Sequence, residues 1–297
     1  MLLSLCIPTN GKVEWVAQVL DSIYSEKIDE KLFEVVITDN GEGDCLSEYI
    51  KKNKHENLKY YKSNSEGFLN QIDSFKKATG EFCKFVNHRN TLKKGTLIKL
   101  IEFVQTNIDT KPGIFFTNGN LRKNNSIYCR NLGEFLTTMG FYCTWSAGLG
   151  FWKQDFEEYF DYKKTNHMFP HFDILVFPKK EYIVNDDTLF KEVEYDGRKG
   201  YKYNFYYAFA VIYPNLLLQL VCDKRISVND FNKMKKNNLN HMAYSYIECK
   251  LLKKQTDCDL TNIKSYMRIF YSLKQFYFHI FTFICSKILL KFKIKCL

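Results

Sequence analysis

The sequence predicts an α/β fold with a mostly parallel, doubly wound central sheet, flanked by helices and followed by a helical carboxyl-terminal extension. Three observations support this prediction. Within the first forty residues, a strand, a polar turn, an amphipathic helix and a second strand form a βαβ unit. Strand-like and helix-like segments then alternate to about residue 117, as they do in parallel sheets. With 297 residues, 45% of them hydrophobic, the chain can bury a large core.

The elements of the first half follow from hydrophobic periodicity and from turn residues. The first helix, Val13–Tyr24, has its apolar residues at helical spacing on one face. Strands are expected at 2–8, 33–40, 58–61, 82–86 and 113–117, and further helices at 45–52, from the turn at 64–68 to 78, and at 95–106.

The second half is less regular. A glycine-containing aromatic stretch at 145–152 precedes a helix-like segment at 154–160. Residues 203–222 carry no charge, and this length is typical of a membrane-spanning helix. Because polar residues and Pro214 interrupt it, we interpret it as a buried helix broken at Pro214. We therefore place one domain at 1–220 and a helical extension at 221–297.

Cysteine use and the start of the chain predict a cytoplasmic protein. Ten cysteines are scattered without any C-x-x-C pair, which argues against a zinc ribbon or a small disulfide scaffold. Met1 leads directly into a strand-like segment, without a basic region or a small-residue cleavage site. No secretory signal is therefore expected.

The positive charge of the chain is concentrated near its end. The formal net charge is +10, and no acidic residue follows Asp259. Seven basic residues follow it: Lys264, Arg268, Lys274, Lys287, Lys291, Lys293 and Lys295. This asymmetry indicates a basic tail rather than a generally basic domain.

The tail, residues 265–297, also repeats apolar residues at mixed three- and four-residue spacing. Its uncharged core, Gln275–Ser286, has 12 residues, fewer than the roughly 20 that cross a bilayer. Cationic flanks beside a wide apolar face predict a helix in the interface of an anionic membrane. A helix that caps the domain core is the alternative. Nucleic acid is not expected as a partner, because no known reading motif accompanies the basic residues.

Polar residues end the first two predicted strands. Pro8, Thr9 and Asn10 end the first strand, and Asp39 ends the second. A carboxylate at this edge of a sheet can accept hydrogen bonds from a uracil-type N–H or from ribose hydroxyls. A plain turn at 39–41 is the alternative, since these residue types form turns in any fold. The position after the second strand of a βαβ unit favours a nucleotide site.

These strand ends resemble the amino terminus of family 2 glycosyltransferases of the GT-A fold, whose first strand ends in a Pro-Thr-Asn-like turn and whose second ends in an aspartate. The resemblance covers residues 1–190. It implies a GT-A-like sheet and a nucleotide-sugar donor. The donor site that we predict from it consists of Pro8, Thr9, Asn10, Asp39, Asn64, Asn87, Arg89 and Asn90.

The segment Ala78–Val86 resembles the family's Ala-x-Gly-Glu-Tyr strand entry, which an Asp-x-Asp motif usually follows to bind a divalent cation such as Mg²⁺ or Mn²⁺. Here Asn87-His88-Arg89-Asn90 takes that place, without the anionic oxygens that hard cations require. Three interpretations stay open: Arg89 pairs directly with the diphosphate, the site is inactive, or the alignment is shifted. The residues present argue against a metal cofactor and for metal-independent transfer.

The acceptor side rests on a second resemblance. Met168–Leu175 resembles the aromatic-Pro-His segment of abequosyltransferase-like members, and this implies that Asp173 is the base that deprotonates the acceptor. His171 is an alternative base or an acceptor-orienting group. A buried core histidine and a helix-start aspartate are the alternatives without function. Trp145–Gly150, which includes Gly148, matches the family's acceptor loop, where Trp145 can stack on a sugar.

Together these features predict an inverting glycosyltransferase. It would move a sugar from a nucleotide-sugar donor to a lipid-linked or polysaccharide acceptor in bacterial surface glycan synthesis, at the cytoplasmic face of the cell membrane. A degenerate, non-catalytic protein that binds nucleotides or glycans is the alternative, because both metal carboxylates are missing. A nucleotidyltransferase would require a glycine-rich phosphate loop, and Gly41-Glu42-Gly43 is too weak a match to one.

Overall fold

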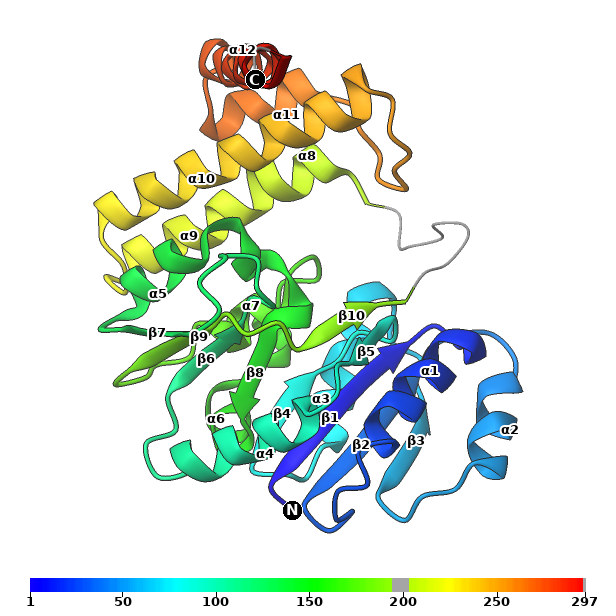
Figure 1. Cartoon of the computed structure of the whole chain (residues 1–297). Coiled ribbons are helices and arrows are strands. Elements are labelled where there is room, and N and C mark those ends of the chain that lie inside the picture. The colour runs from blue at the N-terminus through cyan, green and yellow to red at the C-terminus, as the bar shows by residue number, and fades with distance from the viewer. Residues whose placement is uncertain (194–202, 296–297) are drawn as a thin grey trace. The chain divides into compact units, whose positions relative to one another are not determined.

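The computed structural model describes residues 1–193 and 203–295, with side chains up to residue 286. It divides into two compact units, Met1–Tyr195 and Asp196–Leu297, which are described separately (Figure 1). The first unit contains the central sheet, and the second is helical.

The first unit is built on an eight-stranded sheet in the order β3-β2-β1-β4-β8-β6-β9-β7 (Figure 1). Strand β1 pairs in parallel with β2 and β4, β2 with β3, and β6 with β9. The predicted mostly parallel, GT-A-like architecture is therefore confirmed. The strands are β1 (Leu3–Thr9), β2 (Phe33–Asp39), β3 (Leu58–Lys62), β4 (Phe82–Phe85), β6 (Gly113–Phe116), β7 (Ser126–Cys129), β8 (Leu149–Trp152) and β9 (Tyr182–Asn185).

Strand β8 shows where the sequence was harder to interpret. It runs antiparallel between β4 and β6, so part of the predicted acceptor loop is a central strand. Its four residues are all buried, so it lacks the alternation of apolar and polar residues that identifies a half-buried strand. A second sheet pairs β5 (Asn90–Leu92) with β10 (Phe190–Glu192) and joins the segment after β4 to the end of the unit.

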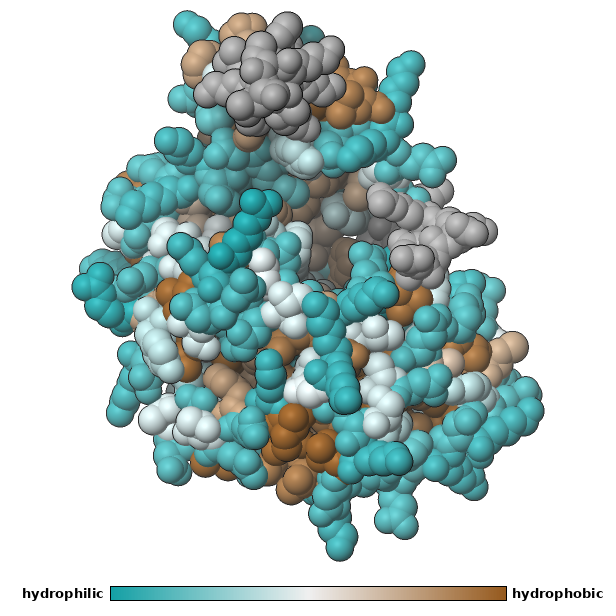
Figure 2. Space-filling model, in the orientation of Figure 1, coloured by the Kyte–Doolittle hydropathy of each residue, from teal (hydrophilic) through white to brown (hydrophobic). Residues whose placement is uncertain are grey.

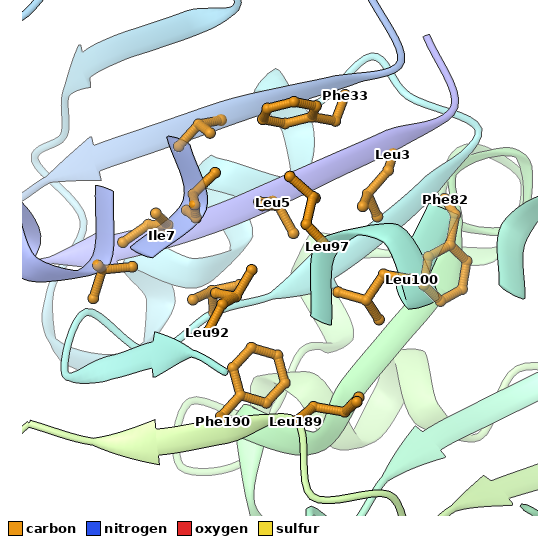
Figure 3. Close-up of a cluster of buried hydrophobic side chains, with 14 of the residues drawn as sticks. Leu3, Leu5, Ile7, Phe33, Phe82, Leu92, Leu97, Leu100, Leu189 and Phe190 are labelled. Carbon is orange, nitrogen blue, oxygen red and sulfur yellow. The ribbon is translucent and has the colours of Figure 1, made fainter. Parts of the chain in front are cut away.

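Helices cover both faces of the sheet. On one face, alternate residues Leu3, Leu5 and Ile7 of β1 pack in the core with Leu97 and Leu100 of α4 (Figure 3). On the other face, β1 and β2 pack against α3. The helices are α1 (Val13–Tyr24), α2 (Cys45–Lys52), α3 (Asn70–Lys77), α4 (Thr96–Asn107), α5 (Leu132–Met139), α6 (Lys153–Tyr159) and α7 (Pro170–Leu175), with short 3₁₀ turns η1 (Gly67–Leu69), η2 (Gly140–Thr144), η3 (Ser146–Gly148) and η4 (Tyr162–Lys164).

The second unit is a group of packed helices. Its long helix α10 starts at a capping box, in which Ser227 and Asp230 satisfy each other's backbone N–H groups. Phe276 of α12 is fully buried, with its ring near those of Tyr206 and Tyr246. The described elements are α8 (Phe205–Tyr207), the π-helical turn η5 (Ala208–Ile212), α9 (Tyr213–Cys222), α10 (Val228–Tyr246), the π-helical turn η6 (Ile247–Leu251), α11 (Ile263–Phe270) and α12 (Leu273–Lys295).

The division between the units lies earlier than the predicted boundary at residue 220. The reason is the packing of residues 205–222, which belong to the helical unit. The buried Asn238 of α10 donates a hydrogen bond to the Phe209 carbonyl at 2.6 Å, and Tyr206 donates to the Met242 carbonyl at 3.4 Å. The apolar character of this stretch therefore serves the second core.

The uncharged stretch is continuous through Pro214. The helix widens into the π turn η5 just before α9, and this widening accommodates Pro214, which has no N–H to donate within the continuous helix. The predicted break is thus a local widening. Within the described residues, Phe205–Cys222 is the one helical stretch long and apolar enough to span a membrane, and 56% of it is buried inside the protein.

A buried carboxylate stabilises β2, the strand next to the edge strand β3. Glu34 of β2 accepts hydrogen bonds from Ser4 Oγ at 2.6 Å and from the Thr79 N–H at 2.5 Å, and it pairs with Lys59 at 2.5 Å. Burial raises the pKa of the Glu34 carboxyl, but its contacts with Lys59, Ser4 and Thr79 outweigh burial and hold the pKa below its usual 4.5.

We predict that Glu34→Gln lowers the free energy of unfolding by about 1–2 kcal/mol near neutral pH, because the ion pair with Lys59 is lost. A lowered pKa stabilises the fold above the unfolded-state value and ceases to do so as the pH falls through the folded-state value. In urea unfolding, the difference from wild type should therefore shrink between about pH 7 and pH 3. Glu157→Gln, at an exposed ion pair with Lys153, is the control. An unchanged difference at both pH values would contradict the role of Glu34.

Candidate functional site

The candidate site lies where β1, β2 and β4 end. These strands are parallel, so their carboxyl ends share one edge of the sheet. The Asn70 side chain joins two of these ends, because its amide donates to the backbone carbonyls of Thr9 and Thr38, both at 3.0 Å. The edge is therefore fixed by hydrogen bonds before any ligand binds.

Asp39 lies at the end of β2 and is 1% exposed. Its Oδ1 accepts a hydrogen bond from the Gly41 N–H at 2.8 Å, and its Oδ2 accepts from Tyr60 Oη at 2.8 Å and from Lys62 Nζ at 3.3 Å. A carboxylate has about four acceptor positions. Three are used here, which leaves one on Oδ1.

Two glycines allow the loops after β1 and β2 to touch. A Cβ on Gly41 would lie 2.2 Å from the Asn10 carbonyl oxygen, so a side chain has no room there. Gly11 adopts the left-handed region, with φ of +80°, and a Cβ on it would lie 3.2 Å from Asp39 Oδ1. The two glycines therefore let the loop backbones pack close to each other and to Asp39.

The other predicted donor residues of the first three strands lie at the same edge. Thr9 is buried, Pro8 is half-buried and Asn10 is exposed after β1. Asn64 is exposed after β3, which pairs in parallel with β2. The structure thus brings Pro8, Thr9, Asn10, Asp39 and Asn64 to one edge, in keeping with the parallel pairing that the sequence predicts.

The segment after β4 joins the same edge through a side-chain hydrogen bond. His88 Nδ1 lies 2.7 Å from Thr9 Oγ1. Burial, helped by the charge of Arg89, lowers the pKa of His88 to about 3, so the ring is neutral at physiological pH. The Arg89 guanidinium packs over the Trp15 ring, 5.7 Å from its centroid. Asn87 Oδ1 accepts from the Arg89 N–H at 3.0 Å, and Asn90 starts β5.

These groups do not suit a divalent cation. The segment offers an amide oxygen already hydrogen-bonded, a neutral buried imidazole and a guanidinium, whereas Mg²⁺ and Mn²⁺ prefer carboxylate oxygens. No group of three or more His, Cys, Asp or Glu side chains suited to a metal occurs in the described part of the chain. Arg89 instead supplies a positive charge next to His88, over the Trp15 ring.

The predicted acceptor loop carries a cluster of aromatic rings. Trp145 is 40% exposed, and its ring centroid lies 4.7 Å from that of Tyr142 and 5.9 Å from that of Phe141. Flat, partly exposed rings of this kind can stack on the apolar face of a sugar. We call Phe141, Tyr142 and Trp145 the aromatic platform.

Gly148 follows this platform in the chain, as the last residue of η3. It is buried, and a Cβ on it would lie 2.1 Å from Cζ of Phe115, so only glycine lets η3 pack on that ring. Its place in the structure therefore favours a packing role over direct contact with an acceptor.

His171 is also buried, with 3% of its surface exposed. Burial lowers its pKa to about 4, although hydrogen bonds with backbone groups of Cys143 and Thr144 act in the opposite direction. Its Nε2 has no hydrogen-bond partner among the described residues. A neutral, enclosed imidazole that contacts the turn η2 is better placed to orient the aromatic platform than to take a proton from a solvent-exposed acceptor.

Asp173 has the properties of a base. It lies in the first turn of α7, is half-buried, and accepts a hydrogen bond from the Asn166 N–H at 3.0 Å. Burial raises its pKa to about 6, which the hydrogen bond from Asn166 only partly offsets. Such a carboxylate is ionised at neutral pH yet more basic than usual. Helix α7 packs against α3, which also carries Asn70.

Some site residues were missed by the sequence interpretation. Tyr60 and Lys62 of β3 hold Asp39, and their i, i+2 spacing is a usable signal, since such residues face the same side of a strand.

Asp186 accepts hydrogen bonds from Thr117 Oγ1 at 2.5 Å and from three N–H groups in residues 121–124, and so shapes the loop after β6. The sequence carries no signal for this role, because Asp187 is also an aspartate and no spacing shows which of the two is buried.

Comparisons with known proteins agree with this geometry. The model of the family described as Glycosyl transferase family 2 matches residues 4–179. Among curated proteins, abequosyltransferase RfbV of Salmonella typhimurium is 29% identical over 120 residues, which are 39% of this chain. The match spans 35% of the length of that relative.

Solved structures share the fold. S. aureus TarS 1–349 in complex with UDP-GlcNAc superposes with a TM-score of 0.61 and 18% identity over 86% of this chain and 77% of that chain. The mannosyltransferase PcManGT from Pyrobaculum calidifontis, in complex with GDP-Man and Mn²⁺, gives a TM-score of 0.51 and 13% identity over 86% of this chain and 76% of that chain.

Proposed function

Because the chain belongs to glycosyl transferase family 2, we propose that it transfers a sugar from a nucleotide-sugar donor to a lipid-linked or polysaccharide acceptor. The observation that carries the proposal is the buried Asp39 at the shared edge of β1 and β2, with one acceptor position open. TarS was solved with UDP-GlcNAc and PcManGT with GDP-Man, and RfbV is named an abequosyltransferase.

The state of Asp39 favours a particular class of nucleobase. A single open acceptor position on Oδ1 matches one N–H donor, such as the imide of uracil or thymine. Guanine presents two neighbouring N–H groups that pair best with both oxygens of a carboxylate, and here Oδ2 already accepts from Tyr60 and Lys62. We therefore place uridine- or thymidine-type donors ahead of guanosine-type donors.

The transfer itself needs a base and a group that stabilises the leaving diphosphate. In the proposed inverting reaction, the acceptor hydroxyl oxygen attacks the anomeric carbon while the bond from that carbon to the diphosphate oxygen breaks. Asp173 takes the hydroxyl proton, because its raised pKa suits a base near neutral pH. Arg89 offsets the charge that develops on the diphosphate, in place of a cation.

A degenerate binding protein is the second candidate, favoured by the absence of carboxylates between Asn87 and Asn90. Such a protein would still bind the nucleotide through Asp39. It would release no nucleoside diphosphate from any donor, whatever acceptor is supplied.

Exposed apolar side chains of the helical unit suggest where in the cell the protein binds its acceptor. Phe278 and Phe281 of α12 are both 62% exposed, and Ile269 of α11 is 56% exposed, close in sequence to Arg268 and Lys274. Figure 2 shows apolar atoms at the surface around α11 and α12. Phe276 and Ile280, by contrast, are buried, so the apolar stripe of the predicted tail is divided between a core face and an exposed face.

We propose that this exposed face binds the anionic inner surface of the cell membrane peripherally, in the cytoplasm. Membrane binding would place the enzyme beside lipid-linked acceptors. The buried position of Phe276 also means that removing residues 265–297 would expose the core of the unit, so point variants test the proposal better than truncation does.

The first prediction concerns donor binding. By isothermal titration calorimetry, UDP should bind more tightly than GDP, and EDTA should leave both affinities unchanged. Asp39→Asn should weaken UDP and uridine alike by about tenfold or more, because the Oδ1 contact is made to the base. Arg89→Met should weaken UDP but not uridine, because the guanidinium meets the diphosphate.

Arg130→Met is the matched control for Arg89, since Arg130 is 88% exposed between β7 and α5. Loss of UDP binding in EDTA would show that a metal is required after all. If Arg89→Met lowered the affinities for UDP and uridine equally, Arg89 would not contact the diphosphate.

The second prediction concerns Asp173. Since the base must be ionised, kcat/KM should fall as the pH drops through about 6, the pKa to which burial raises this carboxyl. Asp173→Asn should lower kcat about 10²-fold or more and leave donor affinity unchanged. Asp161→Asn is the control, because Asp161 also accepts a backbone N–H, from Lys163, but is more exposed. A normal rate for Asp173→Asn would exclude it as the base.

The third prediction concerns the membrane. Phe278→Ser combined with Phe281→Ser should lower sedimentation with phosphatidylglycerol vesicles about tenfold or more, because two exposed rings that would insert into the membrane interface are removed. High salt should weaken binding of the wild type without abolishing it, since only the charge contribution is screened. Tyr128→Ser, at a 73% exposed ring of β7, controls for loss of any surface ring. Unchanged sedimentation of the double variant would refute the assigned face.

A further inference from the structure

Lys84, in the middle of β4, is fully buried. Its Nζ donates hydrogen bonds to three backbone carbonyls: Phe85 at 2.8 Å, Ala147 at 2.7 Å and Leu149 at 3.2 Å. Two of these carbonyls belong to the acceptor loop, which is more than sixty residues away in sequence. Every N–H of the ammonium group therefore has an acceptor.

The surroundings of Lys84 are otherwise apolar. Its Nζ lies 5.0 Å from the ring centroid of Phe116 and 5.2 Å from that of Phe190. No acidic side chain pairs with it within the described residues. Burial lowers its pKa to about 7, and the nearby Cys6 thiol acts weakly in the opposite direction. Burying a lysine without an acidic partner costs free energy. If the side chain only had to fill space, an apolar residue would be enough.

The two ends of this contact belong to different halves of the site. Strand β4 ends two residues before Asn87 and four before Arg89, on the predicted donor side. The Ala147 carbonyl lies in η3, two residues after Trp145 of the aromatic platform. Gly148, also in η3, packs on Phe115 of β6 from the neighbouring position. The loop is thus held by hydrogen bonds from β4 and by close packing on β6.

We propose that Lys84 is a positioning residue that fixes the acceptor loop against the donor strand, so that the aromatic platform presents the acceptor at a set place relative to the leaving diphosphate. The inference rests on the proposed transfer of a sugar and adds to it a residue that binds neither substrate. The two loop carbonyls that Lys84 binds tie η3 and the first residue of β8 to β4, in addition to the backbone pairing of β8 with β4 and β6.

The first test follows the loop itself and does not depend on activity. Hydrogen–deuterium exchange of the full chain should be about tenfold faster across residues 145–150 in Lys84→Met, because the loop loses the hydrogen bonds that join it to β4. Lys84→Gln keeps two N–H donors and should show a smaller increase. Lys153→Met is the matched control, because Lys153 Nζ also donates to two backbone carbonyls, of Phe75 at 3.1 Å and Lys76 at 3.4 Å, outside the acceptor loop.

The second test separates positioning from stability. In Lys84→Met and Lys84→Gln, the acceptor KM should rise about fivefold or more while UDP affinity and donor KM stay at wild-type values. If Lys84→Met does not fold, Lys84→Gln carries both measurements. Wild-type exchange across 145–150 in a folded variant, or equal changes in donor and acceptor KM, would overturn the proposal.

The exchange measurement also distinguishes this inference from the function on which it rests. A wild type that transfers no sugar would remove the proposed function and, with it, any catalytic purpose of the loop. Faster exchange confined to 145–150 would then establish Lys84 as a structural anchor only, and the positioning role would be rejected.

Discussion

The structure of the site depends on one constraint, the parallel alignment of β1 with β2 and β4. This pairing brings Thr9, Asp39 and His88 to the same edge, and Asn70 fixes that edge by donating to the carbonyls of Thr9 and Thr38. Asp39 then accepts hydrogen bonds from Tyr60 and Lys62 of β3. A preformed edge loses little conformational freedom when a ligand binds, because its side chains are already ordered.

Two basic side chains, Arg89 and Lys84, lie on the segment formed by β4 and the residues that follow it. Arg89 takes a place where relatives are expected to carry carboxylates, and it is steadied by the Trp15 ring. Lys84 is a second basic side chain, buried inside the unit, and its Nζ donates hydrogen bonds to backbone carbonyls of the acceptor loop. In the proposed reaction, Arg89 contacts the diphosphate of the donor, whereas Lys84 positions the loop that binds the acceptor.

Much of the fold was predictable from sequence, because its first half obeys local rules. The helices Val13–Tyr24 and Cys45–Lys52 were predicted at their observed bounds from hydrophobic spacing. Strand β8 and the change of core near residue 195 were not, because both depend on partners distant in sequence. The same holds for the site: Asp39 follows a recognisable strand, whereas Lys84 looks like a strand residue until its carbonyl partners at Ala147 and Leu149 are known.

The most direct test of this account is release of nucleoside diphosphate from a panel of nucleotide sugars by the full chain, in the presence of EDTA and a bacterial lipid extract as acceptor source. The account predicts release with a uridine- or thymidine-type donor that requires both the extract and the protein. Nucleotide binding without release from any donor, with or without Mn²⁺, would contradict it and identify a binding protein.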